Sequence, residues 1–140
     1  MAPIPSCLVF LPRNSIGVRL RRALEAGGYG EQLRFARDLE TLAHLLSHPD
    51  HGFRLAVLVA DQSSRLKEFV GLADQLADLG VLLVVPDTSD ETTALAHALG
   101  PRYITRIDDD FSEFPEILGR LLRRWTSEAV DEPKSQEEKP

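Results

Sequence analysis

Residues 55–61 read Leu-Ala-Val-Leu-Val-Ala-Asp, a continuous apolar run that ends on a carboxylate and is followed by a polar Gln-Ser-Ser turn. A run that is apolar on both faces predicts a central parallel strand, because helices cover such a strand above and below, whereas a half-solvated strand alternates. In open parallel α/β sheets, ligands collect just beyond the carboxyl ends of the strands. The sequence therefore places Asp61 where binding or chemistry is expected.

Four further strands are predicted around this central one. Residues 7–11 and 81–85 are fully apolar runs, residues 32–36 are only weakly apolar and fit an edge, and residues 102–107 give the fifth strand. Segments with apolar residues at helical spacing separate the strands. Because parallel strands joined through helices cross over with a right hand, the expected fold is α/β, a single doubly wound five-stranded parallel sheet of order 2-1-3-4-5, a flavodoxin-like (βα)5 unit.

Capping signals predict where the helices begin. Asn14 or Ser15 caps the first helix. The third helix is expected to be continuous through the apolar stripe of residues 66–76, and Thr88 followed by Glu91 forms a capping box for the fourth. The final helix opens with Asp110 and Glu113 and carries the cleanest stripe in the chain, with apolar residues from Phe114 to Trp125 at helical spacing.

Composition indicates one domain of residues 1–126 followed by a disordered acidic tail, residues 127–140. The 140 residues are 43% hydrophobic, enough for a single core. The tail has five acidic residues against two lysines, so it carries half of the net charge of −6, and this balance does not favour nucleic acid. Cys7 is expected to be a buried small hydrophobe in a reducing compartment. No apolar run approaches the roughly 18 residues of a membrane span, so a soluble cytoplasmic protein is predicted.

Small landmarks recur in a fixed order along the chain: Gly28-Tyr29, then the Ala-Arg-Asp of residues 36–38, then Ala96 and Gly100, then the Tyr-Ile-Thr-Arg of residues 103–106. Together with the order and length of the elements over residues 5–126, they resemble the receiver domain of bacterial two-component response regulators. The resemblance implies the sheet order given above and a role in signalling.

The residues that carry the chemistry of receivers are mostly replaced. Receivers hold Mg²⁺ with an acidic pair at the end of the first strand, and counting back from Gly28-Tyr29 puts Leu11 and Pro12 there. Neither side chain can ligate a metal. The hydroxyl residue that ends the fourth strand in receivers is replaced in the region of Val85, and the lysine that ends the fifth strand is replaced by Arg106.

Asp61 resembles the phosphate-accepting aspartate of receivers, although counting from Arg54 equally places Val59 or Ala60 at that position. An aspartate attacks phosphorus only if a hard divalent cation neutralises the incoming oxygens. Without the acidic pair, we interpret Asp61 as a helix-capping or turn residue.

Two other clusters suggest sites of their own. Asp87 and the triple aspartate 108–110 follow the fourth and fifth strands, so a relocated Mg²⁺ site with Asp61, Asp87 and Asp108 as ligands is one hypothesis. We favour the other, a set of turn and capping residues with Arg106 as an ion-pair partner. His44, His48 and His51 invite a metal site, but a solvated helix end explains them as well. The group Arg13, Arg19, Arg21 and Arg22 either attracts an anion or acidic partner or forms a solvated basic face.

The last helix points to a protein interface. Arg120, Arg123 and Arg124 cluster toward its C-terminal end, beside Trp125. In receivers the surface of the fourth helix, the fifth strand and the last helix serves dimerisation or partner docking, and the resemblance implies the same face here. A partly exposed Tyr103 or Trp125 on it would suit a binding hot spot.

The sequence thus favours a receiver-like regulatory module that acts by protein–protein interaction, as a homodimer or docked on another protein, without catalysis, cofactor or standard aspartyl phosphorylation. Three alternatives stay open. The chain is an atypical receiver phosphorylated on Asp61 with Mg²⁺, a small α/β nucleotide-binding protein or enzyme that uses the acidic rim, or the amino-terminal regulatory piece of a larger protein.

Overall fold

A single sheet of five parallel strands forms the centre of the molecule, and a computed structural model describes residues 6–135 of the chain. The strands lie in the order β2-β1-β3-β4-β5, so the predicted topology is confirmed. Their bounds are β1 Cys7–Phe10, β2 Leu33–Ala36, β3 Leu55–Val59, β4 Gly80–Val85 and β5 Tyr103–Arg106. Each predicted strand is present, and its bounds differ from the expected ones by one or two residues.

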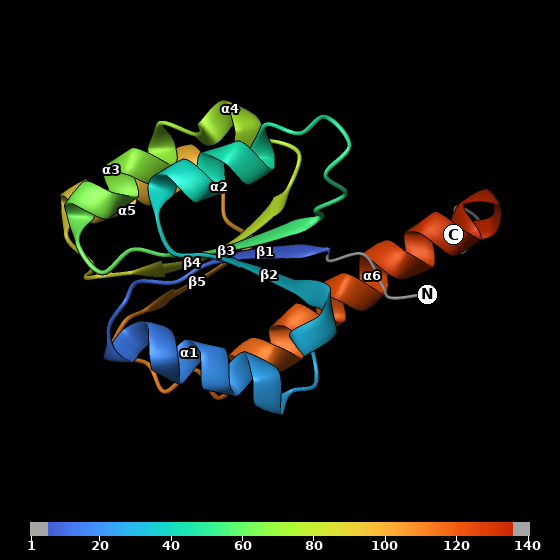
Figure 1. Cartoon of the computed structure of the whole chain (residues 1–140), viewed down its shortest axis with the longest axis horizontal. Helices are drawn as coiled ribbons and strands as arrows, with labels where there is room; N and C mark the ends of the chain where they lie inside the picture. Colours follow the sequence, from blue (N-terminus) through green and yellow to red (C-terminus); the bar gives the residue numbers. More distant parts are fainter. Residues whose placement is uncertain (1–5, 136–140) are drawn as a thin grey trace.

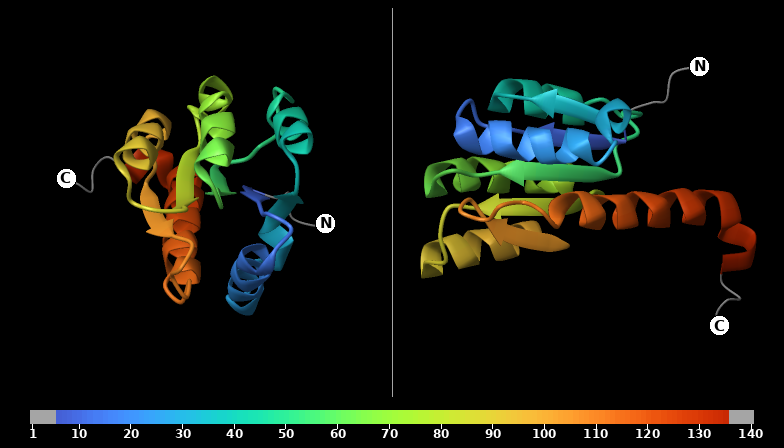
Figure 2. Two further views of the ribbon diagram at one scale, coloured as in Figure 1. Left: turned by 90° about the vertical axis from the view of Figure 1, so that its left-hand side faces the viewer. Right: turned by 90° about the horizontal axis from the view of Figure 1, so that it is seen from below.

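Helices cover both faces of this sheet (Figure 1). The α-helices are α1 Ser15–Ala26, α2 Leu39–Leu46, α3 Ser63–Val70, α4 Ala73–Leu76, α5 Asp90–Leu99 and α6 Phe114–Ser135, and a 3-10 turn, η1, spans Gly30–Gln32. Helices α1 and α6 lie on one face, and α2, α3, α4 and α5 lie on the other (Figures 1 and 2).

The central strands are buried on both faces, as their continuous apolar runs predicted. Every residue of β1, β3 and β4 is buried. Alternate side chains of a strand belong to two hydrophobic cores, one on each face of the sheet. Leu8 and Phe10 pack toward α2, α3 and α5, while Cys7 and Val9 pack toward α1 and α6. Both faces of the sheet therefore contribute to stability through burial of apolar area.

The first helix begins where its capping signal predicted. The Oδ1 atom of Asn14 accepts hydrogen bonds from the backbone N–H groups of Ile16 and Gly17, at 3.0 and 3.3 Å. Asn14 rather than Ser15 is therefore the cap, and it satisfies two of the N–H groups that the start of a helix leaves unpaired.

Three predicted helix boundaries were wrong. The continuous third helix is broken at Gly71 and Leu72 into α3 and the single turn α4, so there are six α-helices between and after the strands within residues 6–135 instead of five. The fourth helix is capped by Ser89, whose side chain accepts from the N–H of Thr92, and not by Thr88. The last helix begins at Phe114.

The late start of α6 has a packing cause. Phe111 adopts a left-handed backbone conformation with φ +62°, and its ring is 1% exposed. It packs edge-on against Phe114 and under the guanidinium of Arg19. Asp110 accepts a hydrogen bond from the N–H of Ser112 within this turn instead of opening the helix. Burial of the aromatic ring offsets the local strain.

Helix α6 runs along the sheet and past its amino edge (Figure 2). It continues to Ser135, which differs from the expectation that the chain is disordered from residue 127. Residues 127–135 include Glu, Ala and Lys, which favour helix, together with Pro133, which disfavours it. The remainder of the predicted tail, residues 136–140, lies outside the described residues.

Candidate functional site

The carboxyl ends of β1 and β3 are where the receiver resemblance places the phosphorylation chemistry. Leu11 is 5% exposed and belongs to the core under α1 and α6, and its N–H donates to the carbonyl of Ala36. Pro12 follows it in the turn before α1. Neither residue supplies an oxygen side chain to this edge of the sheet.

Asp61 lies just beyond the end of β3 and joins two turns that are far apart in sequence. Its Oδ2 atom accepts a hydrogen bond of 3.0 Å from Nδ2 of Asn14, 47 residues away. The cap position of α3 is occupied by Gln62, whose side chain makes no capping bond. Of the two interpretations of Asp61, a helix cap or a turn residue, the second agrees with the structure: Asp61 lies in the bend before α3, and its carboxylate is bound to the turn between β1 and α1.

The acidic residues at this edge are each engaged locally and do not form one site. Asp87 accepts hydrogen bonds from Oγ1 of Thr92 at 2.7 Å and from the N–H of Ser89 at 3.0 Å, and these bonds hold the pKa of its carboxyl below its ordinary value. Asp108 pairs with Arg106, with 3.2 Å between Oδ1 and Nε. Among the side chains that the structure describes, no three from His, Cys, Asp or Glu lie close enough to hold a metal ion.

The three histidines predicted as a possible metal group are each held by contacts with neighbouring rings or backbone. The rings of His44 and His48 meet edge to face, with 5.0 Å between their centroids. The Nδ1 atom of His51 accepts a hydrogen bond from the N–H of Phe53 and its ring stacks on the Phe53 ring. These contacts account for the histidines as part of the end of α2 and the loop that follows it.

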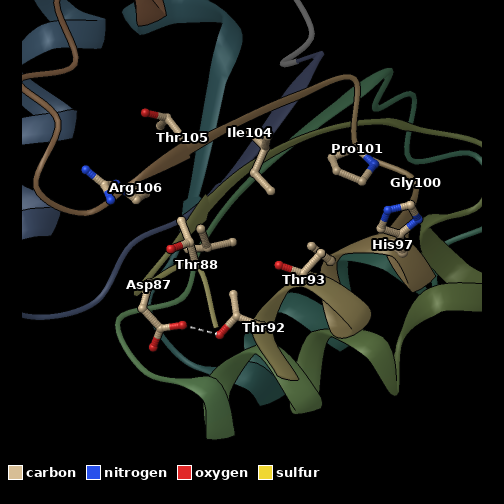
Figure 3. Close-up of a pocket in the computed structure, with 12 residues that line it drawn as sticks. Asp87, Thr88, Thr92, Thr93, His97, Gly100, Pro101, Ile104, Thr105 and Arg106 are labelled. Carbon is tan, nitrogen blue, oxygen red and sulfur yellow. Dashed lines mark hydrogen bonds between the residues drawn. The ribbon is translucent and has the colours of Figure 1, made fainter. Parts of the chain in front are cut away.

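A groove of about 520 Å³ opens between α5 and the edge strand β5 (Figure 3). Its wall on one side is β5 with the residues before it, and on the other side it is α5. We call it the α5–β5 groove; it is lined by Val85, Asp87, Thr88, Thr92, Thr93, Ala96, His97, Gly100, Pro101, Ile104, Thr105 and Arg106.

Ile104 is the main apolar group of this groove. Its side chain is 48% exposed, and Ile104 and Thr93 point into the space between the strand and the helix (Figure 3). Helix α5 presents short side chains along this side, among them Thr93 and Ala96, so it does not cover the isoleucine. An aliphatic side chain is left half in water beside an unpaired sheet edge, a combination that proteins use to bind an extended segment of a partner.

The polar end of the groove lies at the carboxyl edge of the sheet. Asp87 and Arg106 line it there, and the bond between Asp87 and Thr92 fixes the start of α5 (Figure 3). Arg106 is more than half exposed although it is paired with Asp108. The groove therefore offers an apolar wall with one acidic and one basic group at its end.

The predicted interaction face is only partly the surface that the structure presents. Tyr103 is partly exposed, as expected, but it lies on the face of the sheet opposite the α5–β5 groove, where its ring packs edge-on against Phe114 at 5.5 Å and burial raises the pKa of its hydroxyl. Arg120 forms an exposed ion pair with Glu116, and Arg124 also has an interaction. The side chain of Trp125 lies outside the part of the chain whose side chains are described.

Ile104, the principal residue of the groove, was not singled out from the sequence. The signal was the alternation of Tyr-Ile-Thr-Arg in residues 103–106, which gives an edge strand two faces of different character. The sequence does not say which face is uncovered, because that depends on where α5 packs. Arg19 was grouped with a basic face, whereas it donates to the carbonyls of Ile107 and Asp109 and so holds the turn after β5.

The strand order places the chain in the class of open, five-stranded, parallel α/β modules of flavodoxin-like order. No protein-family model matches the sequence, and no curated protein matches it. Among solved structures, it is similar to a Burkholderia pseudomallei protein described as pilus assembly-related, with a TM-score of 0.55, 21% identity, and coverage of 86% of this chain and 90% of that one. At this identity the similarity shows the fold alone. None of the described helices is both long and apolar enough to span a bilayer.

Proposed function

We propose that this chain is a receiver-like regulatory module that binds a partner protein, or a second copy of itself, through the α5–β5 groove, and that its regulation does not use aspartyl phosphate. The observation that carries the proposal is the half-exposed Ile104 beside the edge strand β5. The resemblance to receivers supports the same region, because in that family the corresponding helix and strand serve docking.

The chemistry of the carboxyl edge supports the absence of phosphorylation. Leu11 and Pro12 stand where receivers have metal-binding carboxylates, and Asp61 is hydrogen-bonded to Asn14. Transfer of a phosphoryl group to an aspartate requires a cation to neutralise the phosphate oxygens, and Mg²⁺ prefers several oxygen ligands. The acids near this edge instead bond to neighbouring hydroxyl, amide and guanidinium groups.

The exposed area of Ile104 sets the scale of the expected effect. Full burial of an isoleucine side chain contributes about 1.5–3 kcal/mol. Since about half of this side chain is still exposed, docking has about 1 kcal/mol left to gain from it, which is about fivefold in Kd. An aspartate at this position also has to be desolvated, so Ile104→Asp should weaken binding by more than tenfold.

The test places a photo-crosslinking amino acid at position 104 in the source cells, and in a matched strain at position 75, an exposed glutamine of α4 that lies outside the α5–β5 groove. We expect crosslinks that are specific to position 104, either to a second copy or to another protein. Because the structural neighbour is described as pilus assembly-related, proteins of pilus assembly are the first partners to examine. The affinity of the identified partner is then measured with Ile104→Asp and with the control Gln75→Asp.

Equal crosslinking at both positions, or equal affinity of both variants, would contradict the docking proposal. The phosphorylation part is tested by amide NMR titration with Mg²⁺ and then with beryllofluoride, a phosphoryl mimic. We expect no shifts near Asp61. Shifts there that spread to Arg106 and α6 would show that the chain is a working atypical receiver.

A further inference from the structure

A second groove lies at the opposite edge of the sheet, over α1 and the carboxyl ends of β1 and β2. Its volume is about 470 Å³. We call it the arginine groove; it is lined by Leu11, Pro12, Arg13, Asn14, Gly17, Val18, Arg21, Arg22, Glu25 and Arg37. The α5–β5 groove is beside β5 and this one is beside β2, at the two ends of the strand order.

We propose that the arginine groove binds a short acidic peptide segment of a partner protein, with an aliphatic side chain of that segment against Val18. This docking site is separate from the α5–β5 groove and does not depend on it. With both grooves filled, the chain would join two partners.

The charge of the groove is opposite to that of the chain. Four arginines and one glutamate line it, whereas the whole chain has a net charge of −6. The side chains of Arg22 and Arg37 form no hydrogen bond or ion pair with any other residue that the structure describes, and Arg13 has only an electrostatic attraction to Asp38. Cations that a fold gathers and leaves unpaired are complementary to carboxylates supplied from outside.

One arginine is held in place by the fold. The Nε atom of Arg21 lies 3.1 Å from Oε2 of Glu25, and its guanidinium lies 4.6 Å from the centre of the Phe35 ring. Both contacts restrict the long side chain before any partner arrives. An arginine that is fixed beforehand loses less conformational freedom when it binds a carboxylate.

The arrangement favours a row of carboxylates over a single phosphate group. Phosphate usually binds the free N–H groups at the start of a helix, but Oδ1 of Asn14 already accepts from the N–H groups of Ile16 and Gly17. The cations that remain are side chains spread from the turn before α1 to the turn after β2, which holds Arg37. Guanidinium groups at separate places match carboxylates at successive places along a peptide.

Val18 supplies the apolar part of the site. It is 49% exposed and lines the same groove. Among the described residues only Val18 and Ile104 are large hydrophobics with this degree of exposure, and each lies in one of the two grooves.

The net negative charge of the chain favours a short acidic segment over a long polyanion as the ligand of the arginine groove. The negative charges elsewhere on the chain are screened beyond about 8 Å at physiological salt, so they do not repel a short segment in the groove. A nucleic acid would extend beyond the groove, and these charges would repel its phosphates.

The experiment uses the full chain and a fluorescein-labelled ten-residue peptide, Glu-Asp-Glu-Leu-Glu-Asp-Leu-Glu-Asp-Glu, with fluorescence anisotropy as the readout. A peptide with Gln and Asn in place of every acid is the neutral control. Arg22→Glu and Arg37→Glu reverse charges in the groove, and Arg54→Glu is the matched control, because Arg54 is an exposed arginine before β3 and outside the groove.

We expect the acidic peptide to bind at least about tenfold more tightly than the neutral one, and the two groove variants to weaken it about fivefold or more, while Arg54→Glu changes it less than about twofold. Val18→Ser should also weaken binding. Amide shifts should map to Arg13 and Val18 and leave Ile104 unmoved.

Three results would overturn the proposal: equal binding of the acidic and neutral peptides, groove variants no weaker than Arg54→Glu, or tighter binding of inorganic phosphate or a single-stranded oligonucleotide through the same arginines. Unchanged binding in Val18→Ser would remove the aliphatic contact from it. Circular dichroism of each variant confirms that the fold is kept, since the altered arginine side chains are exposed.

Discussion

The substitution Gly17→Ala tests how the turn after β1 sits on α1. Gly17 is buried in the first turn of α1, and a Cβ atom built on it would overlap the backbone oxygen of Pro12 and lie 3.4 Å from Cβ of Leu11. A backbone oxygen cannot rotate away as the end of a flexible side chain can. Alanine here must therefore push the turn off the helix, and this turn carries Asn14, the cap of α1 and the partner of Asp61.

Two opposing effects decide the magnitude. Alanine raises helix propensity by up to about 1 kcal/mol relative to glycine. Overpacking of a well-packed site costs about 1–3 kcal/mol, and the upper part of that range applies because the contact is with backbone. The free energy of unfolding of Gly17→Ala should thus fall by about 1–2 kcal/mol, which lowers Tm by about 3–8 °C in a domain of this size.

Urea unfolding at 25 °C, followed by circular dichroism, measures this change. Gly30→Ala is the control, because a Cβ there meets nothing within 4 Å. The control should change the free energy of unfolding by less than about 0.5 kcal/mol. An increase in the stability of Gly17→Ala, as for an ordinary glycine in a helix, would refute the close approach of the turn to α1.

Two further predictions concern titratable groups. Burial of Cys7 raises the pKa of its thiol well above the ordinary range, so Ellman's reagent at pH 8 should leave the native thiol unmodified and react at once in 6 M guanidinium chloride; rapid reaction of the native protein would contradict this burial. Hydrogen bonds from Thr92 and Ser89 lower the pKa of Asp87, so its contribution to stability is present above the ordinary value of 3.8 and is lost as the pH falls through the lowered value. Asp87→Asn should therefore flatten the dependence of stability on pH between that lowered value and 3.8, and urea midpoints with the same pH slope as the wild type in this range would count against it.

The strands were predictable because their signal is local. A run such as residues 55–59 is apolar on both faces, and only a strand between two helical layers buries such a run. The sheet order then follows from the handedness of the crossovers. Helix starts were less predictable where a tertiary contact decides them: α6 begins at Phe114 because the Phe111 ring enters the core first.

The candidate sites were predictable only in part. Arg13, Arg21 and Arg22 were singled out as a basic group, but Arg19 had to be removed from it and Arg37 added. Sequence spacing places Arg19 with the others on α1, and it does not show that the turn after β5 lies within reach of the guanidinium. In the same way, the metal group of Asp61, Asp87 and Asp108 was suggested by position after the strands, while their partners were set by short-range hydrogen bonds and an ion pair.

By itself, the sequence determined the α/β class, the five parallel strands and their order, because burial patterns and chain handedness act along the chain and need no knowledge of distant neighbours. The tertiary structure alone decided which groups meet. Parallel pairing of β1 with β2 brings the turn at Arg13 beside Arg37, and the packing of a helix with short side chains leaves Ile104 half exposed. Both depend on distances between segments far apart in sequence, which local patterns do not encode.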